Sequence, residues 1–381
     1  MKHYDYIISG AGAAGLSLLM RMMQHTYFND KQILVIDKAP KNTNDRTWCF
    51  WEKTPGLFEP VVHHKWQQIH FYSNYYSSLL NLHPYQYKMI RGIDFYNYVT
   101  NEAASRANIS FVYGEVEAVG NEGENAIVVF NGERFTGGYV FNSILFTKPV
   151  VPADKYLLLQ HFKGYLVETE NAAFDPQQAT LMDFRINQNH GTSFVYVLPV
   201  APNKALVEYT LFTKDLLPHD EYEKVLHEYI TTYLNLPHYH IAEQEFGIIP
   251  MTNVKFIKKI DRVINIGTAG GQTKASSGYT FQFIQKQTQQ LVNDLVSAGE
   301  IKDHAKFFER RFNLYDSTLL NILHNKKMGG DEIFADLFKK NAPERVLRFL
   351  DNESDLEDEM NIMASVPSGI FMKAAWQEMF K

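Results

Sequence analysis

The first apolar stretch of the chain, residues 4–9, has the length and composition of a short buried strand. It leads into GAGAAG at residues 10–15, and then into a run of Leu and Met that predicts a helix to about residue 23. A second apolar stretch, residues 32–36, ends at Asp37. The order of strand, glycine turn, helix, strand and acid predicts a dinucleotide-binding unit at the start of the chain.

Each glycine of this motif has a separate steric role. Gly10 permits the tight turn between strand and helix, Gly12 lets the backbone approach a pyrophosphate, and Gly15 lets the helix pack close to the strand. The start of the helix then offers free N–H groups and a positive dipole end to phosphates. Asp37 is expected to accept hydrogen bonds from an adenosine ribose.

A secretory signal peptide is the alternative interpretation of the N-terminus, because residues 7–20 carry no charge. Asp5 interrupts the start of the apolar run, Lys2 is the only basic residue before it, and glycines break it. These features favour the dinucleotide site.

The pattern changes between residues 155 and 215, where short strands alternate with tight turns and predict an antiparallel sheet, and a helix is expected over residues 216–236. A second strand, glycine turn and helix follow late in the chain, with GTAGG at residues 267–271 and a helix over 281–298. Two glycine turns so far apart are typical of a fold that holds an extended FAD. We expect a discontinuous FAD-binding domain (1–60, 87–150 and 245–298), an antiparallel-sheet substrate domain (61–86 and 151–244) and a helical C-terminal region (299–381).

Composition narrows the choice of partners and compartment. The net charge of −6 and the lack of a basic run argue against a nucleic-acid partner. The 27 Phe and 22 Tyr favour a bulky apolar cavity or surface. Cys49 is the only cysteine, which fits a reducing compartment, and no run of 18 apolar residues predicts a membrane span. The 14 histidines lack the spacing of a metal site, so no metal is expected.

Three further positions suit a bound nucleotide, and each has a structural alternative. Arg46 could reach a phosphate or the edge of a flavin, or it could stack on Trp48. Arg91 precedes a predicted helix and could bind diphosphate, or it could be a solvated charge at the helix end. Val116 lies on a strand that could pass the adenine, or it could be ordinary sheet core.

Several longer motifs resemble those of flavin-dependent lycopene β-cyclases of the bacterial type, over most of the chain. They are GAGAAG, RTWCFW (46–51), YKMIRGIDFYNYV (87–99), LQHFKGYLVE (159–168), FDP (174–176), LMDFR (181–185), SFVYVLP (193–199), LVEYT (206–210) and IGTAGGQTKASSGYTF (266–281). The resemblance implies an α/β fold like that of p-hydroxybenzoate hydroxylase. It also implies acid-catalysed, non-redox cyclisation of the end groups of lycopene and related linear carotenoids, with FAD in its reduced form and NADPH as the reductant.

Two departures from the family pattern stand out. Relatives commonly carry an aspartate in the late glycine motif, where this chain has Thr268 or a neighbour. The catalytic motif of the family often has two consecutive acids, whereas here Glu208 is followed by Tyr209. The cofactor-binding residues that we expect are Gly10, Gly12, Ala13, Ala14, Gly15, Asp37, Lys38, Arg46, Arg91, Val116, Gly267, Thr268 and Gly270.

Glu208 is the predicted catalytic acid. On its strand it shares a face with Leu206, Thr210 and Phe212, so a carboxyl group facing a pocket there would be desolvated, and its pKa would rise. The alternative is an ion pair with Arg185 that stabilises the fold. Asp183 is the second candidate for the acid, although Arg185 on the same strand suggests an ion pair for it too.

Two other functions share the nucleotide motifs. One is a flavin monooxygenase or prenyl-chain reductase acting on an apolar substrate, and the other is a non-catalytic carotenoid-binding flavoprotein. Because lycopene dissolves in bilayers, we expect a cytoplasmic protein that is peripherally associated with a membrane. Apolar side chains beside basic ones in the C-terminal third are the predicted contacts: Phe334, Leu337 and Phe338 near Lys339 and Lys340, and Phe349 near Arg345 and Arg348.

Overall fold

Strand β1 (Lys2–Ser9) lies inside the first sheet of the computed structural model, which describes residues 2–303 and 307–381. The strands of this sheet follow the order β17-β18-β11-β1-β2-β8, and β1 pairs in parallel with β2 and β11. Strand β10 pairs antiparallel with β11, and β9 pairs antiparallel with β10. The bounds are β2 Ile33–Asp37, β8 Ile109–Tyr113, β9 Val116–Glu122, β10 Asn125–Phe130, β11 Glu133–Asn142, β17 Lys259–Ile260 and β18 Val263–Asn265.

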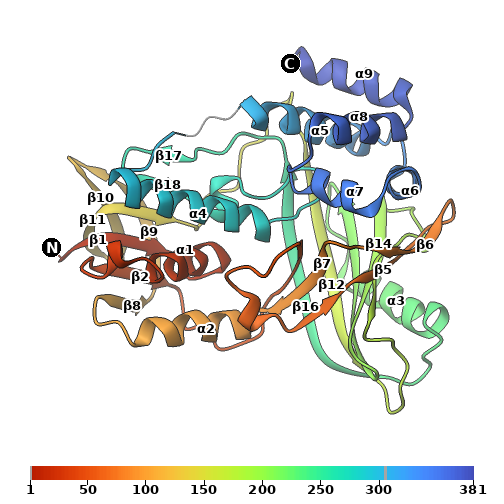
Figure 1. The fold of residues 1–381 in the computed structure, drawn as a ribbon, viewed down its shortest axis with the longest axis horizontal. Coiled ribbons are helices and arrows are strands. Elements are labelled where there is room, and N and C mark those ends of the chain that lie inside the picture. The colour runs from red at the N-terminus through yellow and green to blue at the C-terminus, as the bar shows by residue number, and fades with distance from the viewer. Residues whose placement is uncertain (1, 304–306) are drawn as a thin grey trace.

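Three helices pack on one face of this sheet (Figure 1). Helix α1 (Ala13–Met23) contacts both α2 (Gly92–Ala104) and α4 (Phe281–Ala298), and their apolar sides form one core with the sheet. The antiparallel strands β9 and β10 add apolar side chains to a second core with Ile7, Leu34 and Ile36. Because both faces are covered, β2 is buried along its whole length, as expected for a strand in a parallel sheet.

The second sheet has the order β16-β12-β15-β14-β13-β5-β6 and is antiparallel except where β13 meets β5. Its bounds are β5 Gln68–Tyr72, β6 Ser77–Asn81, β12 Leu157–Glu168, β13 Gln178–Asp183, β14 Thr192–Ala201, β15 Lys204–Thr213 and β16 His240–Thr252. Helix α3 (His219–Glu228) and the turn Tyr229–Tyr233 share an apolar core with this sheet. A small third sheet joins β3 (Thr47–Glu52), β7 (Gln86–Arg91) and β4 (His64–Trp66).

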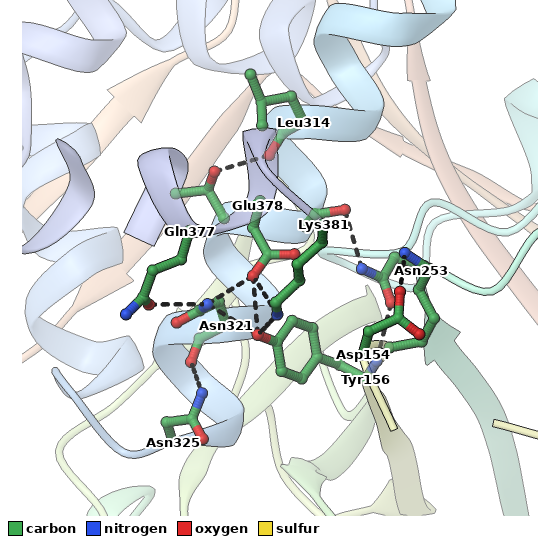
Figure 2. Close-up of polar contacts among 12 residues, drawn as sticks. Asp154, Tyr156, Asn253, Leu314, Asn321, Asn325, Gln377, Glu378 and Lys381 are labelled. Atoms are coloured by element: carbon green, nitrogen blue, oxygen red, sulfur yellow. Dashed lines mark hydrogen bonds and ion pairs between the residues drawn. The ribbon is translucent and has the colours of Figure 1, made fainter. Parts of the chain in front are cut away.

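The C-terminal region consists of helices that pack over the second sheet (Figure 1): α5 Phe307–His324, α6 Gly330–Lys340, α7 Pro343–Leu350, α8 Leu356–Ser365 and α9 Ser368–Met379. The sequence pattern predicts a helix from Ala305 to Leu323, and Ala305 lies outside the described residues. Figure 2 shows how the end of α9 is held against α5 and the start of β12. The carboxylate of Glu378 accepts hydrogen bonds from Tyr156 Oη at 2.8 Å and from Asn321 Nδ2 at 2.6 Å, and Lys381 lies 2.8 Å from it.

The α/β fold with a separate antiparallel sheet and a helical C-terminal region is confirmed. The predicted domain boundary at residue 245 falls inside β16, so residues 245–252 belong to the second sheet. The prediction that Phe334, Leu337 and Phe338 face a membrane is wrong, because α6 turns these side chains into the core. Phe334 stacks on Phe184, for example, with 5.8 Å between ring centroids. Phe349 is also partly buried there.

Candidate active site

The first glycine turn has two glycines that the fold requires and one that leaves space. Gly10 has a φ of +100°, and a Cβ on Gly15 would lie 2.0 Å from the carbonyl oxygen of Gly10. A Cβ on Gly12 would meet no heavy atom within 4 Å. Gly10 and Gly15 therefore serve the turn and the packing of α1, whereas Gly12 keeps the space before the helix open.

The start of α1 offers its backbone to an anion. Gly12 is the N-cap and provides no side-chain cap, and the first turn, with Ala13 and Ala14, contains no acidic residue. Asp37 is buried at the end of β2, where its Oδ2 accepts a hydrogen bond from Ala11 N at 2.5 Å. The neighbouring Lys38 is exposed.

The start of β9 lies beside the end of β2. The backbone N–H of Gly114 donates to the carbonyl of Asp37 at 2.9 Å, which brings Val116 into this corner. The side chain of Val116 is buried in the sheet core. Any contact of Val116 with a nucleotide would therefore have to come from its backbone.

The late glycine turn, η4 (Gly267–Gly270), packs directly on the first one. A Cβ on Gly267, whose φ is +59°, would lie 2.7 Å from Cβ of Ala14. Gln287 of α4 holds this turn, because its side chain accepts from Gly267 N at 3.1 Å and donates to Asn265 O at 3.1 Å. A Cβ on Gly270 would lie 2.2 Å from that same carbonyl oxygen. The two motifs thus form one continuous backbone surface.

This surface fits a dinucleotide. The open space at Gly12 and the uncapped helix start suit a diphosphate, and the buried carboxylate of Asp37 suits a ribose. The late turn offers a second stretch of backbone beside the first helix turn at Ala14.

A cavity of about 350 Å³ connects the late glycine turn with the second sheet. Thr268 lines it from the turn, Arg46 from the loop before β3, and Glu208 from β15. Aromatic side chains make up much of the remaining wall: Trp48, Tyr87, Phe162, Tyr196, Tyr279 and Phe281. The loop after the turn closes against β12, where a Cβ on Gly278 would lie 1.8 Å from Gln160 Oε1.

Glu208 is the carboxyl group that the sequence placed in a pocket, and the structure places it there. Thr210, two residues along the same face of β15, donates to Glu208 Oε1 at 2.9 Å. Burial raises the pKa of Glu208 well above its usual range, and the nearby charge of Glu245 raises it further. A carboxyl group in these surroundings holds its proton to a higher pH than one in water does.

Glu245 on β16 is a site residue that the sequence analysis missed. Its side chain lines the same cavity and lies within hydrogen-bonding reach of Glu208. Burial raises the pKa of Glu245 too, although Thr47, Glu208 and the charge of Arg46 oppose this rise. The only feature of the sequence that could have indicated this neighbour was Gly164, a small residue within an otherwise bulky strand. In the structure that strand, β12, lies between the strands of Glu208 and Glu245.

The alternative role for Glu208, an ion pair with Arg185, does not occur. Arg185 binds Asp183 instead, with its Nε 2.9 Å from Asp183 Oδ1, and Tyr229 Oη donates to Asp183 Oδ2 at 2.7 Å. Asp183 is fully buried and does not line the cavity of Glu208. Its contacts are those of a residue that stabilises the sheet, so the structure favours Glu208 over Asp183 as the acid.

The two arginines lie in different places. Arg46 lines the cavity of Glu208, and its Nη1 donates to the carbonyl of Asp45 at 2.7 Å. Arg91 is paired with Asp94, with its Nε 2.7 Å from Asp94 Oδ2, and lines an adjacent cavity of about 480 Å³. Thr47, Leu206 and Glu245 line both cavities.

Within residues 2–303 and 307–381, no group of three or more His, Cys, Asp or Glu side chains could hold a metal ion. Over the same ranges, no helix is long and apolar enough to cross a membrane.

Sequence relatives of the chain include carotenoid enzymes of plants and bacteria. It is 26% identical over 295 residues to a chloroplastic neoxanthin synthase of Solanum tuberosum, covering 72% of this chain and 57% of that protein. It is 27% identical over 216 residues to a lycopene beta-cyclase of Pantoea ananas, covering 55% of this chain and 52% of that protein. It is 24% identical over 260 residues to a lycopene beta-cyclase of Pseudescherichia vulneris, covering 65% of this chain and 62% of that protein. The chain thus spans between 52% and 62% of the length of these relatives.

Similar solved structures establish the fold. A geranylgeranyl bacteriochlorophyll reductase-like protein from Thermoplasma acidophilum matches with a TM-score of 0.70 and 15% identity, over 99% of this chain and 100% of that one. A probable FAD-dependent monooxygenase from Pseudomonas aeruginosa matches with a TM-score of 0.57 and 13% identity, over 86% and 98%. The family model "Lycopene cyclase protein" matches residues 5–375, and the chain therefore belongs to this family.

Proposed function

We propose that this protein is a lycopene β-cyclase, which isomerises the linear end groups of lycopene and related carotenoids to β-rings. The observation that carries the proposal is the carboxyl group of Glu208, which lies in an aromatic cavity beside the late glycine turn and whose pKa is raised by desolvation. The family and its bacterial relatives named lycopene beta-cyclases support the same reaction. Oxygen activation by a flavin monooxygenase does not need a protonated carboxyl group at this position.

The reaction needs a strong, well-placed acid, because an alkene has no lone pair to accept a proton. Glu208 gives its proton to the terminal double bond of the substrate, which leaves a tertiary cation. The next double bond attacks this cation and closes the ring. Loss of a proton from the carbon that formed the new bond restores a double bond, so atoms and electrons balance without an oxidant or reductant.

The aromatic wall of the cavity suits such a cation. The faces of Trp48, Tyr196 and Phe281 carry negative quadrupole charge that stabilises a positive charge nearby. The same rings exclude water, which would otherwise capture the cation as an alcohol. The chain therefore supplies both the acid and a dry, cation-tolerant space.

FAD is the cofactor that we propose for the joined glycine turns, with Gly10, Gly12, Ala13, Ala14, Gly15 and Asp37 on the dinucleotide side and Gly267, Thr268 and Gly270 on the other. When bound in its reduced form, it would supply negative charge beside the cavity. NADPH as the reductant rests on the family resemblance alone.

A membrane surface is the proposed source of the substrate. Helix α9 presents an apolar face of Met372, Trp376, Met379 and Phe380, each more than 60% exposed, with Lys373 and Lys381 beside it. Leu356, Met360 and Met363 of α8 are exposed as well. Exposed aromatic and Met side chains flanked by lysines suit the boundary between lipid headgroups and acyl chains. The single Cys49 is consistent with the proposed cytoplasmic side.

The cofactor proposal predicts opposite effects of two glycine substitutions. Gly12→Val should fold with near-normal stability but lose FAD, because its side chain would occupy the open space meant for the diphosphate. Gly15→Ala should lower the free energy of unfolding by several kcal/mol, because its Cβ would clash with the carbonyl of Gly10. Flavin released on denaturation and urea unfolding measure the two effects. Full FAD content in a folded Gly12→Val variant would contradict the proposal.

The catalytic proposal predicts that Glu208→Gln binds FAD but loses activity by at least about a hundredfold, because the amide has no proton to transfer. A host that makes lycopene should accumulate lycopene with this variant and a cyclic product of equal mass with the unaltered protein. Asp183→Asn is the matched control, and it should change stability more than the rate per folded molecule. A normal rate with Glu208→Gln would exclude Glu208 as the acid.

The redox proposal predicts that turnover requires reduced FAD but consumes no net reductant. Under anaerobic conditions, many molecules of cyclic product should form for each NADPH oxidised. The measurement compares product with NADPH consumed in the same sample. A ratio of one to one, or a product mass shifted by oxygen or hydrogen, would instead identify a monooxygenase or a reductase.

The membrane proposal predicts that Trp376→Ser together with Phe380→Ser weakens binding to liposomes by at least about tenfold, since each ring would otherwise bury in the interface. Flotation of the purified protein with vesicles measures the bound fraction. Ile260→Ser is the control, because Ile260 is 48% exposed and lies on β17 of the first sheet, which is remote from α9 (Figure 1). Equal binding by all three proteins would exclude α9 as the contact.

A further inference from the structure

Glu208 and Glu245 lie on either side of a glycine in the strand that separates their own two strands. Gly164 of β12 pairs with Glu208 of β15 on one side and with Glu245 of β16 on the other. Residues directly opposite each other in a sheet project to the same face, so both carboxyl groups point to one side of β12. A Cβ on Gly164 would lie 3.0 Å from Glu245 Cγ and 3.3 Å from its Oε1, which means that the missing side chain makes room for the pair.

The pair is short of one hydrogen-bond donor. Thr210 donates to Glu208 and the side chain of Thr47 binds Glu245, yet Oε1 of Glu245 is buried without a partner in the part of the chain that the structure describes. Two ionised carboxylates this close, away from water, would repel each other strongly. One proton held between them removes the repulsion and supplies the missing donor.

The surroundings decide which member holds the proton. Two groups face the pair from the N-terminal side of the cavity: Cys49 on β3 and Arg46 in the loop before it. Three phenols complete the wall: Tyr87 on β7, Tyr196 on β14 and Tyr279 in the late loop. Glu243 is the next acid on the strand of Glu245. Arg46 is the positive charge that acts on Glu245. The negative charge therefore belongs on Glu245 and the proton on Glu208.

We propose that Glu245 is a positioning residue for the catalytic acid, whose carboxylate accepts the O–H of Glu208, orients it, and shares a single proton with it through each turnover. The proposal rests on the proposed function and deepens it. Glu208 gives the proton to the substrate, both carboxylates are briefly negative beside the cation, and the proton lost from the ring returns to the pair. The pair thus ends each cycle as it began.

Infrared titration of the purified protein tests the shared proton without using activity. A protonated carboxyl band should persist above pH 7 in the unaltered protein and be absent from Glu208→Gln. In Glu245→Gln the band should disappear at a pH lower by at least about one unit, because the negative neighbour that favours the protonated form is gone. Asp351→Asn identifies the band of a further buried carboxyl group that titrates in this range, since burial raises the pKa of Asp351 to about 7.

The pH profile of cyclisation supplies the second test. Glu245→Gln should move the alkaline limit of activity to lower pH and reduce the rate at neutral pH by about tenfold, whereas Glu245→Asp, which keeps the charge, should restore much of both. Glu122→Gln, which removes an exposed acid on β9 that does not line the cavity, is the matched control and should leave the limit unchanged. Gly164→Ala keeps both carboxyl groups, but its methyl group should increase the distance between them. It should therefore shift the alkaline limit of activity in the same direction as Glu245→Gln.

The outcomes separate the two proposals. An infrared band and an alkaline limit that stay unchanged in both Glu245→Gln and Gly164→Ala would overturn the role of Glu245. A profile that only falls in height, equally for Glu245→Gln and Glu245→Asp, would also overturn it, because a merely structural residue behaves in this way. If the unaltered protein forms no cyclic carotenoid but the infrared shift occurs, the proton-sharing pair stands and the proposed function fails.

Discussion

The site depends on keeping two carboxyl groups side by side away from water. This arrangement requires an antiparallel sheet whose register brings Glu208 and Glu245 level with the same residue of β12, and it requires that residue to be glycine. It also requires threonine hydroxyls that bind the carboxyl oxygens without adding charge. Desolvation, usually a cost for a carboxylate, would here serve the proposed function, because it raises the pKa of Glu208.

The close contact between the two glycine turns is the second constraint. Gly267 packs against Ala14, so the start of α1 and the late turn act as one surface. From this turn the chain continues through the loop that ends at Gly278, which packs against Gln160 of β12. The backbone that would hold a dinucleotide is thereby linked to the strand next to the acid. A displacement of the late turn would therefore alter both the backbone that would hold the dinucleotide and the strand next to Glu208.

The parts of this arrangement that are local in sequence were predicted, and those that depend on register were not. Alternation along one strand was enough to put Glu208 in a pocket, whereas Glu245 reaches the same pocket only through the pairing of β12 with β16. The C-terminal helices expose a different ambiguity. Aromatic residues beside lysines suit both a membrane face and a core-facing helix, and Phe338 belongs to the core, whereas Trp376 on α9 is exposed.

The fold alone does not determine the chemistry, since proteins described as reductase-like or as monooxygenases share it at 15% identity or less. The distinction lies in how charge is distributed in the cavity. Burial raises the pKa values of Tyr87, Tyr196 and Tyr279 above their usual range, so these phenols stay neutral and do not compete as bases. Burial likewise keeps the Cys49 thiol protonated. Of the two acids that line the cavity, Glu245 is the one that we propose as the negative charge, beside the proposed acid Glu208.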